Sequence, residues 1–275
     1  MGAMTGLTPS TGKHLRRMAL FAVCLAPAIY FAPIPTAVLL ACGALDVSRH
    51  RRIDYALIEG YFTGKGLLTW LLSPINLCAD VLSRGPRGMP RLEQLPAECR
   101  QEIDTCIAAF LANEGPITET FRPHMQDGKR AMLAFRWFGV PLKSDLRIAA
   151  FEQSFRYVKT IAISTFRGRE QTSWHFGPQR LTYRVLRNLK PLDSPDVYVA
   201  VDDQVHRWNA EPLLIFDDTM RHKSVNDVDT VRYCLFIDII RPNRFHAAFE
   251  VAVGGLGLLA SSFRAVFYKN WSFVR

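Results

Sequence analysis

An uncharged apolar stretch near the start of the chain constrains the fold more than any other feature. It runs from Met18 to Leu45, reads MALFAVCLAPAIYFAPIPTAVLLACGAL, and contains no charged residue. It is longer than the ~20 residues with which a helix crosses a bilayer, and too long for the apolar core of a cleaved signal peptide. Because Pro27, Pro33 and Pro35 interrupt it, the stretch predicts either one kinked membrane span or a re-entrant hairpin.

Basic residues lie on both sides of this stretch. They are Lys13, Arg16 and Arg17 before it, and Arg49, Arg51 and Arg52 after it. Basic residues mark the cytoplasmic flanks of membrane segments, so both ends are expected to face the cytoplasm. A second apolar stretch, Gly66–Leu82, contains Pro74 and Asp80. It predicts either a marginal span or a helix that lies in the membrane interface.

The charge balance indicates an anionic partner. The 275 residues carry a net charge of +9, and 49% of them are apolar while only 21% are charged. A basic surface suits nucleic acid, a membrane surface or a phosphorylated lipid, and this apolar content excludes a disordered basic tail. The six cysteines form no C-x-x-C pair, so we expect free, buried thiols in a reducing compartment rather than a disulfide framework or a zinc cluster.

A linker rich in proline, glycine and arginine, residues 84–90, predicts the main domain boundary. We therefore expect an N-terminal membrane-associated region (1–90), a central domain (91–245), and a C-terminal helix that is amphipathic or contacts the membrane (246–275). Apolar residues at helical spacing predict a soluble helix over Leu92–Asn113, at the start of the central domain. The apolar segment Phe245–Phe267 is also compatible with a helix, which lies on the membrane or packs on the central domain.

From about Arg130 the apolar residues alternate instead of recurring at helical spacing. The alternation predicts strands at Ala131–Val140, Tyr157–Phe166, Arg180–Lys190, Val197–Val201, Pro212–Phe216 and Val231–Ile240. Turns rich in Gly, Pro, Asn and Asp separate these strands, and the polar segment Lys223–Thr230 is expected to be one of them. Many short strands at such intervals are typical of a β-sandwich or a jelly roll.

Three of these strands place polar or small side chains on one face. Because side chains alternate along a strand, Ser164, Arg184 and Arg232 each lie on a face that is polar or roomy. If these faces line the lumen of a barrel, the lumen is cationic and suits a small dianion. The alternative is that the faces are simply exposed to solvent.

Two histidines follow two different strands. His175 occurs in the sequence SWHFGPQR, and His222 ends the sequence FDDTMRH. Iron sites with two histidines and one carboxylate usually begin His-x-Asp or His-x-Glu, but Gly177 occupies the carboxylate position here. A lone histidine is usually an ordinary packed or exposed residue, so His175 alone does not predict a metal site.

Taken together, these residues resemble the aspartyl/asparaginyl β-hydroxylase family of Fe(II)/2-oxoglutarate dioxygenases. The resemblance covers roughly residues 129–242 and rests on Ser164, HFGP at His175–Pro178, Arg184, Trp208, FDDT at Phe216–Thr219, His222, Asn226, Arg232 and DIIRP at Asp238–Pro242. The stretch GLLTWLLSPINL also resembles bacterial members, which include membrane-bound lipid A 2-hydroxylases and ornithine lipid hydroxylases. The resemblance implies a mainly β fold, a double-stranded β-helix (jelly roll), with N-terminal membrane helices and flanking α-helices.

The resemblance also implies an iron site that lacks a carboxylate ligand. His175 and His222 are the expected Fe(II) ligands. Gly177 marks the vacant position, which water or a substrate group could fill. Together with Arg184, the two histidines are the expected catalytic residues.

2-Oxoglutarate is the second cofactor that the resemblance implies. Arg232 and Ser164 are expected to hold its C5 carboxylate, and Arg184 its C1 end. Arginine suits both tasks because its planar fork matches a carboxylate. In this family, the metal and 2-oxoglutarate activate oxygen for hydroxylation of a C–H bond.

The expected activity is hydroxylation of an acyl chain of a membrane lipid, of the lipid A or ornithine lipid type. The alternatives are β-hydroxylation of Asp or Asn residues in proteins, and a membrane-anchored binding module without turnover. The expected partners are the membrane and a lipid with an anionic head group, and not nucleic acid. The expected location is the bacterial inner membrane, with the catalytic domain facing the cytoplasm.

Two positions depart from the family pattern. Leu186 stands where the family often has histidine on the Arg184 strand, which could alter how the cofactor or substrate is held. Lys223 stands where glutamate often follows the second histidine, and it adds positive charge near the mouth of the site. Asp217 and Asp218 are expected to shape the turn before the second histidine, and one of them could orient its imidazole. The remaining histidines of the central domain and the C-terminal segment, His124, His206 and His246, are expected to be surface or packing residues.

Overall fold

The computed structural model describes residues 9–127, 130–267 and 271–274. The helices are α1 (Pro9–Phe31), α2 (Pro33–Val47), α3 (Tyr55–Phe62), α4 (Leu67–Leu71), α5 (Ser73–Leu82), the 3-10 helix η1 (Leu92–Gln94), α6 (Ala97–Ala112), α7 (Glu114–Phe121), α8 (His124–Asp127), α9 (Ala149–Glu152) and α10 (His246–Phe267). The strands are β1 (Arg130–Trp137), β2 (Val140–Pro141), β3 (Val158–Phe166), β4 (Glu170–Gln171), β5 (Thr182–Asn188), β6 (Val197–Val201), β7 (Gln204–Arg207), β8 (Leu213–Phe216), β9 (His222–Asn226), β10 (Arg232–Ile240) and β11 (Ser272–Phe273).

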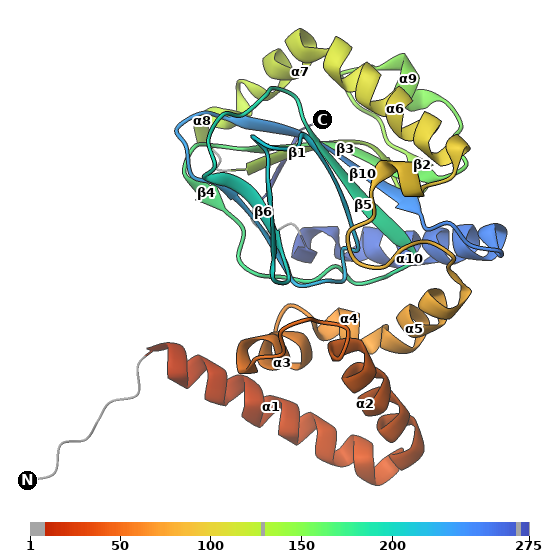
Figure 1. Cartoon of the computed structure of the whole chain (residues 1–275). Helices are drawn as coiled ribbons and strands as arrows, with labels where there is room; N and C mark the ends of the chain where they lie inside the picture. The colour runs from red at the N-terminus through yellow and green to blue at the C-terminus, as the bar shows by residue number, and fades with distance from the viewer. Residues whose placement is uncertain (1–8, 128–129, 268–270, 275) are drawn as a thin grey trace, which may run out of the picture.

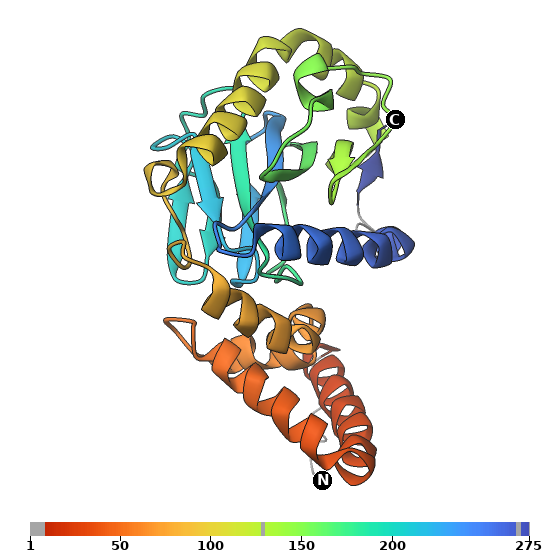
Figure 2. The same cartoon turned by 90° about the vertical axis from the view of Figure 1, so that its right-hand side faces the viewer.

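Two sheets form the centre of the molecule. Helices α6, α7 and α9 lie above the sheets, and helices α1 to α5 lie below them (Figure 1). In the view turned by 90°, α10 crosses beneath the strands, between them and the N-terminal helices (Figure 2). The molecule therefore consists of a β domain with a helical layer on one side and a separate helical group at one end.

The larger sheet has the strand order β11-β1-β3-β10-β5-β8, with β2 paired to the edge of β1. The smaller sheet has the order β4-β9-β6-β7. Within both sheets the named strands pair antiparallel, except that β11 runs parallel to β1. The mainly β expectation therefore holds for the central domain, whereas the segments on both sides of it are helical.

One face of the larger sheet packs against α6. Cys99, Ile103 and Phe110 of α6 recur at helical spacing and are fully buried in one cluster with Ile161 and Ile163 of β3. Burying one such large side chain contributes ~1.5–3 kcal/mol. The alternating residues of β3 point to the opposite face, so the whole strand is buried.

The opposite face of the larger sheet packs against the smaller sheet. Val197, Val199 and Val201 of β6 form one buried cluster with Leu214 and Phe216 of β8. The two sheets therefore enclose a common interior, which is the arrangement that the alternating pattern predicted. The boundaries of the three predicted parts, at residues 90 and 245, stay a prediction.

All six predicted strands are present, with ends shifted by a few residues. The prediction of a turn over Lys223–Thr230 is wrong at its start, because β9 occupies His222–Asn226. This strand is polar, and its pairing with β6 and β4 stabilises it. The Asn226 side chain also donates to the carbonyl oxygens of Arg167 and Thr230, each at 2.9 Å.

The long apolar stretch near the start folds as two helices rather than one. The chain turns at Ala32, and α2 begins at Pro33, whose ring cannot continue the hydrogen bonding of α1. In the described part of the chain, no helix has both the length and the hydropathy to cross a membrane. The structure thus gives no support to the predicted membrane-spanning helices.

The cysteines are unpaired, as predicted. Cys99, Cys106 and Cys234 are buried. The expectation of burial is wrong for Cys24 and Cys78, which lie exposed on the N-terminal helices.

A buried ionic layer joins the N-terminal helices to the β domain. Arg180, which precedes β5, is fully buried and pairs with three carboxylates. Its Nη2 contacts Asp46 of α2, its Nη1 lies 2.7 Å from Asp80 of α5, and its Nε lies 3.3 Å from Asp217 after β8. Burying so many charges is favourable only when each is closely paired.

Two further arginines complete this ionic layer. Arg49, just after α2, places Nη2 2.6 Å from Asp217 and Nη1 3.1 Å from Asp46. Arg241, just after β10, donates to Asp80 at 2.9 Å. Three arginines thus face three aspartates, and the layer holds the loops at this end of the sheets in fixed positions.

We expect Arg180→Ala to lower the free energy of unfolding by ~3–5 kcal/mol, because it leaves buried aspartates without their cation. Urea unfolding followed by circular dichroism measures this change. Arg147→Ala is the control, because that arginine is highly exposed and pairs with Glu152 at the surface. Equal stability of the two variants would contradict the role of the layer.

Candidate metal centre and anion pocket

The two predicted ligand histidines lie side by side. His175 follows β4, His222 begins β9, and the two residues form an isolated antiparallel bridge. Each backbone N–H donates to the carbonyl oxygen of the other residue, at 3.0 and 2.9 Å. Their ring centroids are 4.1 Å apart. Residues separated by a long stretch of sequence are therefore brought together as the resemblance predicted.

Hydrogen bonds at Nδ1 hold both imidazoles in place. Nδ1 of His175 lies 2.8 Å from the carbonyl oxygen of Ser173, and Nδ1 of His222 lies 2.8 Å from that of Met220. A carbonyl can only accept, so each Nδ1 carries the proton and each Nε2 keeps its lone pair. Carbonyl partners of this kind fix the tautomer of metal-binding histidines.

Burial keeps both imidazoles neutral. It lowers the pKa of His175 to about 3, and the neighbouring His222 lowers it further. Burial likewise lowers the pKa of His222 to about 4, with an additional contribution from Arg184. Protons therefore compete weakly with a metal ion for these nitrogens at neutral pH.

A carboxylate fills the space beside Gly177. A Cβ atom added to this glycine would lie 1.9 Å from Oδ2 of Asp218, so only glycine fits there. Oδ1 of Asp218 lies 3.2 Å from Nε2 of His222. Asp218 is thus the aspartate that contacts the imidazole, whereas Asp217 belongs to the ionic layer.

The donor set fits a divalent metal ion held by two imidazoles. Among the described residues, no group of three or more His, Cys, Asp or Glu side chains is arranged to hold a metal ion. The arrangement is therefore a pair of histidines with a carboxylate next to them, in place of three protein ligands. Imidazole nitrogens with adjacent oxygen donors suit Fe(II).

Arg184 on β5 is engaged with two carboxylates. Its Nη1 lies 2.5 Å from Asp218, and its Nε lies 3.1 Å from Asp238 of β10. Its guanidinium also stacks on Phe236, 4.0 Å from the ring centroid. Arg184 therefore positions the carboxylate beside the histidines, and its predicted contact with the C1 end of 2-oxoglutarate stays a prediction.

Arg232 on β10 is a buried cation without a carboxylate partner in the described chain. Only 3% of its surface is exposed, and Nη2 donates to Ser224 of β9 at 2.7 Å. Its Nε and Nη1 have no hydrogen-bond partner among the described residues. Burial lowers the pKa of this guanidinium, but arginine remains charged. A buried, unpaired cation is costly, and an anionic ligand would remove that cost.

Other unpaired polar groups surround this arginine. The amide nitrogen and oxygen of Asn188 and Nε1 of Trp208 are buried and have no partner within the described chain. Asn188 lies opposite Cys234, two residues from Arg232 on the same face, and Trp208 lies 5.7 Å from the guanidinium. Sequence reasoning did not select Asn188, although the alternation had placed it on the same face as Arg184.

Ser164 of β3 lies on the same face as Arg232. The strand register pairs Ser164 with Cys234 and Phe166 with Arg232, which makes Ser164 and Arg232 diagonal neighbours. The Ser164 hydroxyl is buried and donates to the carbonyl oxygen of Cys234 at 3.3 Å. Ser164 and Arg232 are buried, so the alternative of a solvated face is wrong for these two residues, whereas the cationic lumen stays a prediction.

Strand β9 lies between the buried Arg232 and the histidine pair. His222 and Ser224 are two residues apart, so their side chains share one face, ~7 Å apart along the strand. Arg232 is hydrogen-bonded to Ser224. Arg232 and His222 are therefore linked through one face of β9.

The two residues that depart from the family pattern, Leu186 and Lys223, each contact aromatic or apolar side chains. Leu186 pairs with Phe236 and Leu214 in the strand register, and it gives the lumen an apolar wall where the family often has histidine. Lys223 places its ammonium group over Trp174 and Tyr198, at 5.3 and 5.9 Å. Lys223 therefore forms part of a basic, aromatic surface next to His222.

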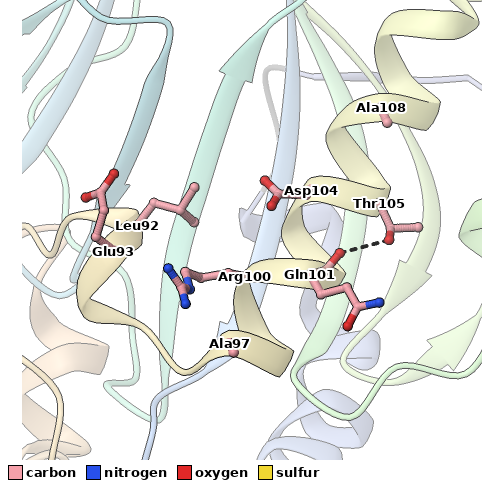
Figure 3. A pocket seen from close by; sticks show the side chains of 8 residues that line it. All are labelled: Leu92, Glu93, Ala97, Arg100, Gln101, Asp104, Thr105 and Ala108. Carbon is pink, nitrogen blue, oxygen red and sulfur yellow. Dashed lines mark hydrogen bonds between the residues drawn. The ribbon is translucent and has the colours of Figure 1, made fainter.

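The other histidines of the central domain and C-terminal segment lie apart from the histidine pair. His206 packs edge-on against Trp208, with centroids 4.7 Å apart, on the side of Arg232, and His246 contacts the carbonyl oxygen of Arg156. A groove of about 540 Å³ runs along η1 and one side of α6 (Figure 3). It is lined by Leu92, Glu93, Ala97, Arg100, Gln101, Asp104, Thr105 and Ala108. None of these residues belongs to the histidine pair or to the anion pocket.

We expect acid to destabilise the metal-free protein through the histidine pair. Both imidazoles are neutral in the folded state, whereas they take up protons below about pH 6.5 when the chain unfolds. Stability is therefore full above that pH and is lost as the pH falls towards 4, by about 2 kcal/mol per imidazole between pH 7 and pH 5. Urea unfolding at the two pH values measures the loss. A His175→Gln, His222→Gln double variant with an unchanged loss would contradict this explanation.

Comparisons with solved structures give only weak likenesses. One is an oxidoreductase of the 2OG-Fe(II) oxygenase family from Burkholderia pseudomallei, with 15% sequence identity and a TM-score of 0.25. The match covers 34% of this chain and 52% of the Burkholderia chain. A predicted oxalate decarboxylase from Thermotoga maritima gives 12% identity, 30% and 67% coverage, and a TM-score of 0.25. Such scores carry no argument about the fold or the site.

Comparisons of sequence are more informative. Residues 142–242 match the family model described as aspartyl/asparaginyl beta-hydroxylase. The chain is also 29% identical over 142 residues to the ornithine lipid ester-linked acyl 2-hydroxylase of Rhizobium tropici. This match covers 47% of this chain and 50% of the relative. This chain thus spans half the length of the relative. The matched region contains the histidine pair, Arg184 and Arg232, and in this region the chain is similar to the aspartyl/asparaginyl β-hydroxylase family.

Proposed function

We propose that this protein is an Fe(II)/2-oxoglutarate-dependent dioxygenase that hydroxylates an acyl chain of a membrane lipid. The observation that carries the proposal is the buried guanidinium of Arg232, whose Nε and Nη1 have no partner among the described residues. It lies on the same lumen as two imidazoles with available Nε2 atoms. An anion site beside a histidine pair suits a dicarboxylate that also binds a metal.

Each residue of the site has a distinct task in this proposal. His175 and His222 hold the metal through Nε2, and Arg232 binds the C5 carboxylate of 2-oxoglutarate together with Ser164. Bound iron and 2-oxoglutarate together supply the oxidising chemistry that inserts oxygen into a C–H bond.

The carboxylate of Asp218 is set between the metal ligands and Arg184. Arg184 fixes its position through the 2.5 Å contact. Asp218 can therefore accept a hydrogen bond from water or substrate bound beside the metal, at the position that Gly177 leaves without a protein ligand. The apolar wall at Leu186 helps to exclude bulk water from this lumen.

A lipid substrate is supported by two observations. The relative from Rhizobium tropici is named as an acyl 2-hydroxylase of ornithine lipid. In addition, the N-terminal helices expose many large apolar side chains, including Tyr30, Phe31 and Ile34, and exposed patches of this kind mark surfaces that contact membranes or proteins. The proposed substrate is a lipid of the lipid A or ornithine lipid type. The proposed location is the bacterial inner membrane, with the catalytic domain facing the cytoplasm.

We expect His175→Ala and His222→Ala each to abolish metal binding and succinate formation, because one imidazole cannot hold the ion. Manganese(II) binding, followed by electron paramagnetic resonance, reports on the metal without turnover. His124→Ala is the control and should bind and react as the parent does. Full binding by either ligand variant would contradict the assignment.

We expect Arg232→Ala to weaken 2-oxoglutarate binding by ~2–5 kcal/mol, because it removes one partner of a desolvated charge pair. Arg232→Lys should recover only part of the loss, since it lacks the guanidinium fork. Calorimetric titration of the manganese-loaded protein measures both changes. The exposed Arg207→Ala serves as the control. A parent-like titration of Arg232→Ala would remove Arg232 from the site.

We expect lipid extracts of cells that express the protein to contain a membrane lipid with one added oxygen on an acyl chain. The species should be missing when His222→Ala is expressed instead. Mass spectrometry of lipid extracts and of digested proteins distinguishes a lipid substrate from a protein substrate. Hydroxylated Asp or Asn residues without a hydroxylated lipid would favour the protein substrate, and neither product would favour a binding module.

A further inference from the structure

The turn between α1 and α2 exposes large apolar side chains to an unusual degree. Tyr30 is 80% exposed, Phe31 is 81% exposed and Ile34 is 76% exposed. Ile29 and Val38 beside them are also exposed. Both views place this turn farther from the sheets than any other part of the N-terminal helices (Figures 1 and 2). A contiguous apolar surface of this kind is unfavourable in water and marks a contact site.

The backbone of the turn is suited to an environment without water. Pro33 and Pro35 have no backbone N–H, so they leave no unpaired donor. The N–H of Ala32 donates to Ala28 at 2.9 Å, and the N–H of Thr36 donates to Ala32 at 3.1 Å. The Thr36 hydroxyl donates to the Ala28 carbonyl across the turn, at 3.0 Å. These bonds satisfy the carbonyls of Ala28 and Ala32, whereas Pro33 and Pro35 cannot donate to the carbonyls of Ile29 and Phe31. The turn thus has few free N–H donors to carry into hydrocarbon.

The two arms of the turn have the length of one leaflet. The uncharged parts of α1 and α2 begin after Arg17 and end before Asp46. At 1.5 Å per residue, each arm is ~20 Å long. Half of a hydrocarbon core of ~30 Å is ~15 Å, so the pair can enter one leaflet and return.

Exposed arginines lie at the base of both arms. Arg16 and Arg17 precede the uncharged part of α1, and Arg51 and Arg52 follow α2. Each position is where the arms would leave the hydrocarbon, at the level of the head groups. Anionic head groups attract arginine there.

We propose that α1 and α2 form a hairpin that inserts into one leaflet of an anionic membrane, with the turn at Ala32 in the hydrocarbon and the two arginine pairs among the head groups. The occupant of the exposed apolar surface is thus a lipid leaflet. A second copy of the chain fits less well, because it would bring its own arginines against the same base. The inference deepens the membrane location within the proposed function by stating how the N-terminal helices enter the bilayer, and it can be tested without turnover.

The base of the hairpin offers lipid chains a further apolar surface. A cleft of about 200 Å³ lies between α1, α2 and α3. It is lined by Met18, Phe21, Leu40, Tyr55, Ile58, Glu59, Phe62 and Thr63. Through Phe62 the cleft adjoins the cluster that contains Tyr61 and Phe176, next to His175. The hairpin therefore joins the β domain close to the candidate metal centre.

Flotation with vesicles tests the insertion. The full chain should float with vesicles of phosphatidylglycerol and phosphatidylcholine, and more weakly with phosphatidylcholine alone. The double variant Phe31→Glu, Ile34→Glu should lower the partition coefficient by about 100-fold, because two large side chains lose their burial. Val140→Glu is the matched control, since Val140 is 54% exposed on β2 of the larger sheet, and it should float as the parent does.

Quenching by brominated lipids tests the depth. Tyr30→Trp should gain fluorescence that is quenched most strongly by bromine near the ends of the acyl chains. Strongest quenching by bromine near the head groups would mean that the helices lie flat, and would overturn the insertion. Flotation of the double variant to the same extent as the parent would also overturn the insertion. So would self-association of the parent chain without binding to vesicles. Unchanged circular dichroism and manganese binding show that each variant is folded, whatever the activity of the enzyme.

Discussion

The buried pairing of Arg180 with Asp46, Asp80 and Asp217 is the interaction on which the rest of the structure depends. It joins two N-terminal helices to the loops that carry the candidate site. Arg180 follows the His175 loop in the sequence, and Asp217 directly precedes Asp218. Fixing the ionic layer therefore fixes the approach of the carboxylate to the histidine pair. A layer of three arginines and three aspartates is costly to desolvate, and its close pairing offsets that cost.

Two arginines of the lumen show how charge balance assigns different tasks to one residue type. Arg184 is paired with Asp218 and Asp238, so its charge is used within the protein. Arg232 has a serine hydroxyl, aromatic rings and orphaned nitrogen atoms around it. The first arginine therefore fixes the carboxylate beside the histidine pair, whereas the second is a buried cation without a carboxylate partner in the described chain. This difference is the basis for the proposed anion site at Arg232.

The N-terminal helices have one surface that packs on the β domain and one that is exposed. Their inner surface packs on the β domain through the ionic layer and through Tyr61 and Phe176. Their outer surface is apolar around the turn and basic at its base. Close packing at Gly43, where an added Cβ would lie 2.5 Å from the Trp70 side chain, holds α2 against α4. The N-terminal helices are thus packed directly against the loop that carries the histidine pair.

The sequence by itself determined the principal strands. Alternation is a local property, so it predicted the six principal strands and placed Ser164, Arg184 and Arg232 each on a polar or roomy face, while their roles in a site stay a prediction. The pairing of His175 with His222 followed from the resemblance to a family. The tertiary structure alone decided that β9 is a strand, that Asp218 fills the space beside Gly177, and that Arg184 is engaged with two carboxylates. It also decided that the apolar stretch turns at Ala32. These features depend on contacts between residues that lie far apart in the chain, such as Arg180 and Asp46, and no local pattern in the sequence contains them.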